Sequence, residues 1–397
     1  MMLELSYSNK QPESLILQQS AQIPPMKLDE TLPLLFAGDN FYSLSVLLNS
    51  GYRERIDLIY IDPPYNTQQF FTVDNDRVST ISRANNGVIA YSDKLNMNDY
   101  LEFMRERLIL MRELLSECGS IYVHIDSKVG HYLKVIMDEI FGAENFKNDI
   151  ARIKSNPKNF ARRAFGNEKD MILFYAQNSK KNIFNNITMP LSDEDKVEMF
   201  QKVDEHGRRY NTVPVHAPGE TQNGETGSMW RGKYPPKGRH WRSSPNELDK
   251  LDEQGLLEWS KNGVPRIKKF ADEHKGKKIQ DIWQYKDPAY PIYPTEKNIE
   301  MLKMIIQQSS NPDSIILDCF AGSGSTLWAA QFLQRRWIGM DISNIAISTI
   351  QKRMGLFPVQ VIECSETTNL QSEQMKVSGS LKALSSLQVN AASVANF

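Results

Sequence analysis

Short apolar runs that end at polar clusters alternate along this chain with helical patterns, and this alternation strongly limits its possible folds. The runs at 34–36, 56–61 and 120–125 are mostly apolar, and each stops at a polar cluster, as buried parallel strands do. Between them, residues 99–117 and 132–140 place apolar side chains three and four positions apart, which predicts helices. The sequence therefore predicts an α/β fold with a Rossmann-like, doubly wound, mostly parallel sheet.

The regular pattern is interrupted once, after an apolar strand expected at 171–175. The chain then becomes rich in Gly, Pro, Trp and basic residues, and regularity returns with a helix at 296–308 and strands at 314–318 and 337–341. We therefore expect a lead-in over 1–30, a first core part over 31–176, an inserted basic subdomain over 177–280, a second core part over 281–362, and a poorly ordered Ser-, Gln- and Ala-rich tail over 363–397.

Charge and cysteine content narrow the class of protein. The net charge is only −1, yet residues 146–280 hold 26 Lys and Arg against 18 Asp and Glu, so this part is suited to face nucleic acid. Cys118, Cys319 and Cys364 form no C-x-x-C pair, which predicts a reducing compartment and no metal site. Without a signal peptide or an apolar run of about 18 residues, the expected location is cytoplasmic, away from the membrane.

A strand, a Gly-x-Gly turn, a helix, a second strand and an acidic residue follow one another between residues 314 and 341. Gly322 and Gly324 allow the backbone to turn tightly and approach a ligand, and Asp341 lies 19 residues past Gly322, where it can bind two ribose hydroxyls. A P-loop is excluded because no Gly-Lys-Ser/Thr follows. The pattern indicates a nucleoside-bearing cofactor and leaves a dinucleotide and S-adenosylmethionine open.

The tetrad Asp62-Pro63-Pro64-Tyr65 follows the apolar run at 56–61. Two prolines make a rigid turn without N–H donors, so carbonyl groups point outward. The exocyclic amine of a nucleobase is a poor nucleophile, and Asp62 with the Pro63 carbonyl can accept its N–H bonds and free its lone pair. Tyr65 can stack on the base, a contact worth about 1–3 kcal/mol, once the base has left the duplex. The tetrad predicts methylation of a base amine.

These segments together resemble the amino-methylating DNA methyltransferases, specifically the beta-class adenine-N6 enzymes and the modification (Mod) subunits of type III restriction systems. The matching segments are GDN at 38–40, DLIYIDPPYNT at 57–67, GSIYVHID at 119–126, YLKVIMDEIFG at 132–142, YPTEKN at 293–298 and LDCFAGSGST at 317–326. The tetrad precedes the glycine turn, as in the circularly permuted motif order of the beta class. The resemblance implies the S-adenosylmethionine-dependent methyltransferase fold, S-adenosylmethionine as cofactor and double-stranded DNA as substrate.

The resemblance also implies which residues contact the cofactor. Phe320, Gly322 and Gly324 would surround its methionine part, and Asp341 would bind its ribose. Asp39 would lie near its adenine end.

The resemblance implies two further cofactor contacts, and the chain departs from the family pattern at two places. Thr295 and Lys297 would approach that carboxylate. The family usually has proline where this chain has Cys319, and it usually reads Thr-Gln-Lys-Pro where this chain has Glu296 and Asn298 at the second and fourth positions. The effect of Glu296 on cofactor affinity is left open.

Basic residues interleaved with aromatic ones predict phosphate contact and base stacking in two stretches, 147–163 and 228–244. The candidate DNA contacts are Lys154, Lys158, Arg162, Arg163, Arg231, Lys233, Lys237, Arg239, Trp241 and Arg242. The alternative is a solvated basic surface whose tryptophans pack a small core. The loop at 66–92 is expected either to close over the base or to be an ordinary surface excursion, and His124 and Asp126 are expected to shape the sheet edge.

Several alternatives remain open at this level. Asp rather than Ser at position 62 resembles the adenine-N6 enzymes more than the cytosine-N4 enzymes. A non-catalytic DNA-binding protein that retains the fold, or an RNA or protein amine as acceptor, would fit the same pattern. A homodimer and a restriction or target-recognition subunit stay open as partners, and the transfer requires no metal.

Overall fold

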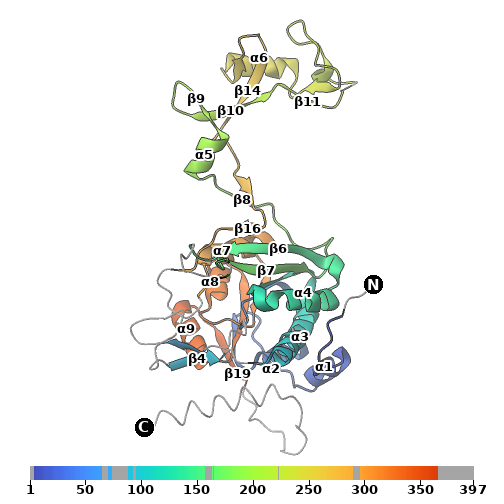
Figure 1. Cartoon of the computed structure of the whole chain (residues 1–397), viewed down its shortest axis with the longest axis vertical. Coiled ribbons are helices and arrows are strands. Elements are labelled where there is room, and N and C mark those ends of the chain that lie inside the picture. The colour runs from blue at the N-terminus through green and yellow to red at the C-terminus, as the bar shows by residue number, and fades with distance from the viewer. Residues whose placement is uncertain are drawn as a thin grey trace, which may run out of the picture. The chain divides into compact units, whose positions relative to one another are not determined.

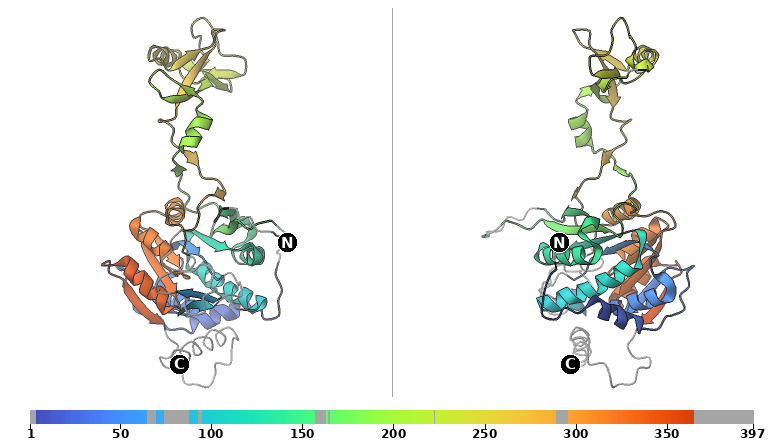
Figure 2. Two further views of the ribbon diagram at one scale, coloured as in Figure 1. Left: turned by 60° about the vertical axis from the view of Figure 1, so that its left-hand side comes forward. Right: turned by 90° about the vertical axis from the view of Figure 1, so that its right-hand side faces the viewer.

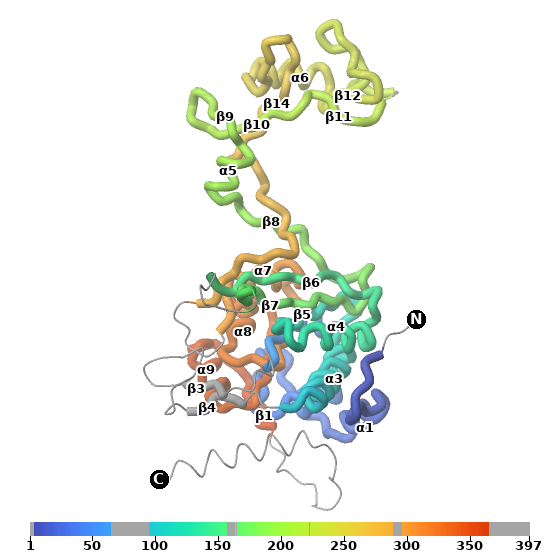
Figure 3. Tube along the Cα trace, in the orientation of Figure 1, coloured from blue at the N-terminus to red at the C-terminus, as the bar shows by residue number. Residues whose placement is uncertain are grey.

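The chain forms two compact units, one built from residues up to 186 and from 280 onward, and one from residues 187–279. The computed structural model describes residues 4–64, 70–73, 88–92, 95–156, 163, 165–221, 223–288 and 296–364. Figure 3 shows the chain leaving the first unit after β7 (Lys169–Ala176) and returning to it before β16 (Ile282–Trp283). The insertion therefore interrupts the core once.

A nine-stranded sheet forms the centre of the first unit (Figure 1), with the order β16-β6-β7-β5-β2-β17-β18-β1-β19. Its other strands are β1 (Leu34–Gly38), β2 (Ile56–Ile61), β5 (Leu115–Ile125), β6 (Phe146–Ile153), β17 (Ile315–Asp318), β18 (Arg336–Asp341) and β19 (Gln360–Cys364). Strand β7 pairs antiparallel with β5 and β6, whereas the remaining pairings in this sheet are parallel. The predicted mostly parallel, doubly wound sheet is confirmed.

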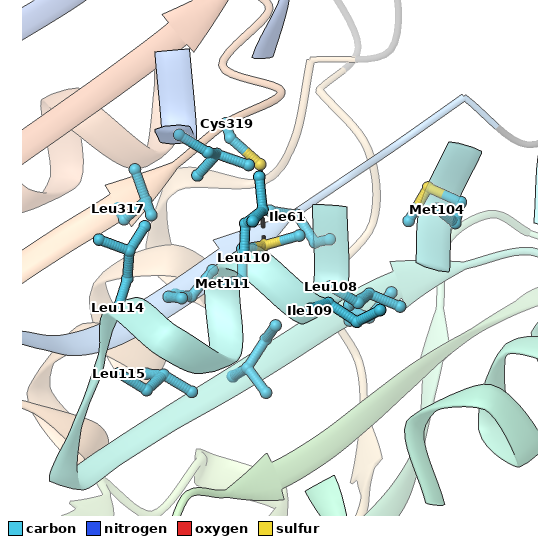
Figure 4. Close-up of a cluster of buried hydrophobic side chains, with 14 of the residues drawn as sticks. Ile61, Met104, Leu108, Ile109, Leu110, Met111, Leu114, Leu115, Leu317 and Cys319 are labelled. Carbon is cyan, nitrogen blue, oxygen red and sulfur yellow. Dashed lines mark hydrogen bonds between the residues drawn. The ribbon is translucent and has the colours of Figure 1, made fainter. Parts of the chain in front are cut away.

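Helices cover both faces of this sheet, as Figure 2 shows in blue to cyan on one side and orange on the other. The first group is α2 (Asn40–Leu47), α3 (Met97–Leu114) and α4 (Ser127–Phe141), and the second is α7 (Ile299–Ser309), α8 (Ser325–Phe332) and α9 (Asn344–Met354). Helix α3 is buried along most of its length because α2 and α4 flank it. Figure 4 shows its apolar side chains packed with Ile61 of β2 and Leu317 of β17 in the hydrophobic core.

The N-terminal segment packs against this core although its sequence is polar. It contains α1 (Glu13–Ala21), whose Ile16 is fully buried. The Tyr7 hydroxyl donates to Glu102 of α3 at 2.6 Å, and Lys10 forms an ion pair with Glu139 of α4 at 2.8 Å. Polar contacts thus attach a segment that offers little apolar periodicity.

The sequence pattern did not predict the strand pair that lies within the loop expected at 66–92. Strands β3 (Phe70–Val73) and β4 (Val88–Ser92) form an antiparallel ribbon within the loop expected at 66–92, the rest of which lies mostly outside the described residues. At the far end, β19 extends two residues into the stretch expected to be a tail, and residues 365–397 lie outside the described part.

The second unit is built around an antiparallel sheet with the order β13-β14-β10-β9. Its strands are β9 (Lys202–Val203), β10 (Arg209–Pro214), β13 (Leu257–Trp259) and β14 (Pro265–Phe270), accompanied by the hairpin β11 (His216–Pro218) and β12 (Arg239–Trp241), the short pair β8 (Thr188–Met189) and β15 (Lys277–Lys278), and helices α5 (Asp193–Met199) and α6 (Pro245–Glu253). Its small core consists of Val215, Trp230, Trp241, Leu248, Leu257 and Ile267.

Among the described helices, none combines the length and apolar character that a bilayer span requires.

Candidate active site

Four adjacent strands deliver the predicted site residues to one edge of the sheet. Strands β2 and β17 pair directly, with Leu58 opposite Ile316, and β18 and β1 follow in order. Asp62 comes after β2, the loop 319–324 after β17, and Asp341 ends β18. The carboxyl ends of parallel strands meet at one edge, where such folds bind ligands. The structure therefore brings Asp62, Pro63 and Pro64 next to the glycine loop.

The glycine loop has a backbone that only glycine adopts easily. Gly322 and Gly324 have φ of 51° and 73°, a left-handed region that other residues rarely enter. A Cβ atom on Gly324 would also lie 2.7 Å from Cγ1 of Ile350 on α9. The loop can therefore turn directly into α8 and keep that helix close to α9.

Asp341 holds this loop in place. Its carboxylate accepts hydrogen bonds from the backbone N–H groups of Gly322 and Ser343, both at 2.8 Å. Burial raises the pKa of Asp341 above its usual value. The residue predicted to bind ribose is thus also a residue that orders the glycine loop.

Asp318 is a further carboxyl group that the sequence reasoning missed. It ends β17 with 2% of its surface exposed and accepts a 3.0 Å hydrogen bond from the N–H of Phe320. Burial, together with the nearby carboxylates of Asp62 and Asp341, raises its pKa to about 7. Its position as the last residue of a strand beside the glycine loop was the signal that could have identified it.

Asp39 begins α2 and is linked to α3 through Arg107. Its carboxylate caps the helix by accepting from the N–H groups of Phe41 and Tyr42 at 2.8 and 3.1 Å. The Arg107 guanidinium, almost fully buried, lies 3.0 Å from the same carboxylate and stacks over the ring of Phe103 at 3.6 Å. Arg107 was not singled out from the sequence.

Arg107 and its neighbours also reach the glycine loop. Asn40 accepts from Arg107 and donates to the carbonyl oxygen of Cys319 at 2.9 Å. Phe320 packs edge-to-face on Phe103, with ring centroids 6.1 Å apart. Cys319 is buried, and its Sγ lies 3.8 Å from Sδ of Met111, as the dashed line in Figure 4 marks. Helix α3 thus supports the loops after both β1 and β17.

Asp62 forms an ion pair with Lys297. The Lys297 Nζ atom lies 2.7 Å from Oδ2 of Asp62, and the two side chains are 10% and 16% exposed. Pro63 is buried and Pro64 half-buried behind the carboxylate. Tyr65 and Thr295 lie outside the described residues.

A buried polar chain supports the strand that carries Asp62. The Tyr60 hydroxyl lies 2.8 Å from Nδ1 of His124, and Nε2 of His124 lies 3.1 Å from Asp170. Burial lowers the pKa of His124. Burial would raise the pKa of Asp170, but the hydrogen bonds from His124 and Lys154 outweigh it and lower that pKa. A neutral imidazole then donates from Nε2 to the Asp170 carboxylate and accepts at Nδ1 from Tyr60. His124 is fully buried and acts on β2 through Tyr60.

Residues 56–352 match the model of a protein family described as DNA methylase (N6_N4_Mtase). The chain belongs to this DNA methylase family. Its members depend on S-adenosylmethionine, so the predicted family, activity class and cofactor are confirmed.

Named relatives of the methylase include type II and type III enzymes. It is 41% identical over 366 residues to the type II methyltransferase M.EcaI of Enterobacter cloacae, covering 89% of this chain and 77% of that one. It is 28% identical to M.KpnI of Klebsiella pneumoniae, with coverage of 77% and 78%. It is also 28% identical to the StyLTI Mod subunit of Salmonella typhimurium, covering 85% of the methylase but only 56% of the Mod subunit.

The predicted DNA contacts of the methylase fall into different environments. In the first unit, Lys154 forms an ion pair with the buried Asp170 at 2.6 Å, so its ammonium is used internally, and Arg163 is exposed. Lys158 and Arg162 lie outside the described residues.

In the second unit, the predicted contacts likewise differ in exposure. Arg231 pairs with Asp249 and Asp252 at 3.0 and 2.7 Å. Trp241 is 5% exposed, packs on Trp230 with centroids 5.7 Å apart and donates to a backbone carbonyl. We therefore assign Trp241 to the core of this unit, because a buried ring offers no face to a base.

Four of the predicted DNA contacts in the second unit are exposed, and no carboxylate ion pair is seen for them among the described residues: Lys233, Lys237, Arg239 and Arg242. Lys233 and Lys237 precede β12, Arg239 lies on β12, and Arg242 follows it. We call these four residues the basic hairpin.

Proposed function

We propose that this methylase transfers a methyl group from S-adenosylmethionine to the N6 amine of an adenine turned out of double-stranded DNA at a short recognition sequence. The observation that carries the proposal is the position of Asp62, in a rigid proline turn on the strand next to the glycine loop. This arrangement places an acceptor for amine protons beside the loop expected to hold the methyl donor. Family membership supports DNA as the substrate.

The residues at the sheet edge fit S-adenosylmethionine. Carboxylates at the ends of β18 and β1, Asp341 and Asp39, suit the ribose hydroxyls and the adenosine end, and the left-handed turns at Gly322 and Gly324 let the backbone approach the methionine part beside Phe320. When bound, this cofactor supplies an electrophilic methyl group carried on a sulfonium.

The chain's own residues then act on the acceptor amine. The Asp62 carboxylate and the Pro63 carbonyl accept the two N–H bonds of the amine, which localises its lone pair toward the donor. The proline turn keeps both acceptors fixed before the base arrives, so the rate gain comes from alignment and preorganised electrostatics. Tyr65 is expected to stack on the extruded base, offsetting part of the few kcal/mol that extrusion costs.

The names of relatives suggest partners for this methylase, and the DNA substrate suggests its location. Two further relatives are named Mod subunits of the type III enzymes EcoPI and EcoP15I. A restriction subunit, a target-recognition subunit and a second copy of this chain are therefore the partners we would look for first. A cytoplasmic location agrees with a DNA substrate and with three cysteines that form no disulfide among the described residues.

The test is methyl transfer to unmethylated plasmid and genomic DNA with methyl-labelled cofactor, followed by digestion to nucleosides. Label is expected in N6-methyladenine, and Asp62→Ala should lower kcat by about 10²–10³-fold while cofactor binding stays within about twofold. Asp57→Asn, on the same strand and bonded to Ser116 at 2.7 Å, is the matched control and should retain activity.

Two results would contradict the proposal. Label in methylcytosine would replace adenine N6 by cytosine N4 as the target. An Asp62→Ala variant as active as the wild type would remove the carboxylate from the mechanism.

A further inference from the structure

The turn formed by residues 296–298 binds three different parts of the first unit. Glu296 forms an ion pair with Arg353 of α9, and Lys297 forms one with Asp62 after β2. Asn298 caps α7 by accepting from the N–H groups at positions 300 and 301, at 3.0 and 3.2 Å, and donates to the carbonyl of Lys286 at 3.0 Å. Consecutive side chains thus fix the turn from three directions.

The pairing of Glu296 explains why Lys297 reaches Asp62. An acidic neighbour in the chain would ordinarily compete for the lysine ammonium. Here Arg353 engages Glu296 and also donates to Oγ of Ser325, at 2.8 Å, in the first turn of α8. The Glu296 and Arg353 side chains are 13% and 11% exposed, so their attraction is less screened than that of a surface pair. The lysine is therefore directed to the other side of the turn.

Two further carboxyl groups lie near Asp62. Asp318 and Asp341 end the two neighbouring motif strands, and the charge of Asp62 contributes to the raised pKa of Asp318. Tyr60 and His124, the polar groups behind Asp62, are uncharged at neutral pH, because burial raises the pKa of the former and lowers that of the latter. Lys297 supplies the positive charge in contact with the carboxylate, and its contact with Oδ2 limits how the carboxylate can rotate.

We propose that Lys297 is a positioning residue that holds the Asp62 carboxylate in the orientation needed to accept the amine protons of the target base, and that the Glu296–Arg353 pair holds Lys297 in place. This assignment rests on the proposed function. It differs from the expectation that Lys297 approaches the carboxylate end of the cofactor. A cofactor ligand would act on cofactor affinity, whereas a positioning residue acts on turnover.

The experiment separates these effects with Lys297→Met and Lys297→Arg in the full chain. Lys297→Met is expected to lower kcat by about 10²-fold, since misplacing a reacting group by about 1 Å can cost that much, while the Kd of S-adenosylmethionine by calorimetry stays within about twofold. Lys297→Arg retains the charge and should keep kcat within about fivefold of the wild type. Lys303→Met, which removes a partly buried lysine of α7 paired with Glu300 at 2.9 Å, is the matched control and should behave as wild type.

The outcomes distinguish this inference from the proposed function. A Kd raised tenfold or more by Lys297→Met, with kcat unchanged at saturating cofactor, would show that Lys297 binds the cofactor and would overturn the assignment. A Lys297→Arg variant as slow as Lys297→Met, with a melting temperature equal to wild type, would also overturn it. If the wild type methylates no base in DNA, the proposed function fails first, whatever the calorimetry shows for Lys297.

Discussion

At the scale of single residues, the most unusual group is the carboxyl of Asp318 beneath the glycine loop. Burial and two neighbouring carboxylates raise its pKa from 3.8 to about 7. Folding therefore favours the protonated form, and the stabilisation associated with it is fully present below about pH 3.8. It is lost as the pH rises from there through about 7. The glycine loop is thus built next to a group that resists ionisation.

Asp318→Asn is expected to make folding less sensitive to pH. The amide oxygen can still accept the hydrogen bond from Phe320, but the side chain no longer ionises. The stability of the variant relative to wild type should therefore rise between pH 4 and pH 7, by at most about 1.4 kcal/mol per pH unit, and stay level above pH 8. Thermal melts from pH 4.5 to 8.5 measure this difference. A stability difference that does not change with pH for Asp318→Asn would contradict the prediction.

At the scale of elements, the positions where the chain departs from the family pattern have definite structural partners. Cys319 packs against Met111 of α3, Asn298 caps α7, and Glu296 pairs with Arg353. Helix bounds were predicted closely where the apolar spacing is regular, as for 99–117 against Met97–Leu114. They were missed for α1, where polar residues dominate. An element is predictable when its own periodicity specifies its buried face.

Gly324→Ala tests whether the junction between β17 and α8 requires glycine. A left-handed residue other than glycine costs about 1–2 kcal/mol, and the added Cβ would also contact Ile350 at 2.7 Å. Gly51→Ala is the matched control, since φ there is 91° and no atom lies within 4 Å of the added carbon. Urea unfolding should show a larger loss for Gly324→Ala, and calorimetry should show weaker cofactor binding for that variant alone. Equal losses in the two variants would mean that contact with α9 is unimportant.

At the scale of the whole molecule, the chain divides into two compact units, and the basic hairpin belongs to the second. The second unit, residues 187–279, carries the basic hairpin, while its tryptophans Trp230 and Trp241 form its core. The alternative interpretation, tryptophans that pack a small core, therefore applies to Trp230 and Trp241. Phosphate contact remains a prediction for the exposed basic side chains, and base stacking by Trp241 does not fit its burial.

Removing two charges from the basic hairpin is expected to weaken DNA binding in a salt-dependent way. Each phosphate contact contributes about 0.9 to the slope of log K against log salt concentration. The double variant Lys237→Ala, Arg239→Ala should therefore lower that slope by about 2, as measured by fluorescence anisotropy between 50 and 200 mM KCl. The double variant Lys261→Ala, Lys275→Ala removes the same charge from other exposed positions and should change the slope less. The opposite ranking would place the DNA on another face.

The sequence alone was sufficient for the fold class, for most central strands of the sheet and for the edge at which the proposed site lies. Apolar periodicity is a local property, and parallel strands bring their carboxyl ends together, so Asp62, Asp341 and the glycine loop could be placed near one another before any side-chain contact was known. The partners of those residues could not. Lys297 binds Asp62, and Arg107 binds Asp39, across long stretches of chain. Such pairs depend on how buried side chains pack and neutralise charge in three dimensions. A local sequence pattern does not predict this packing.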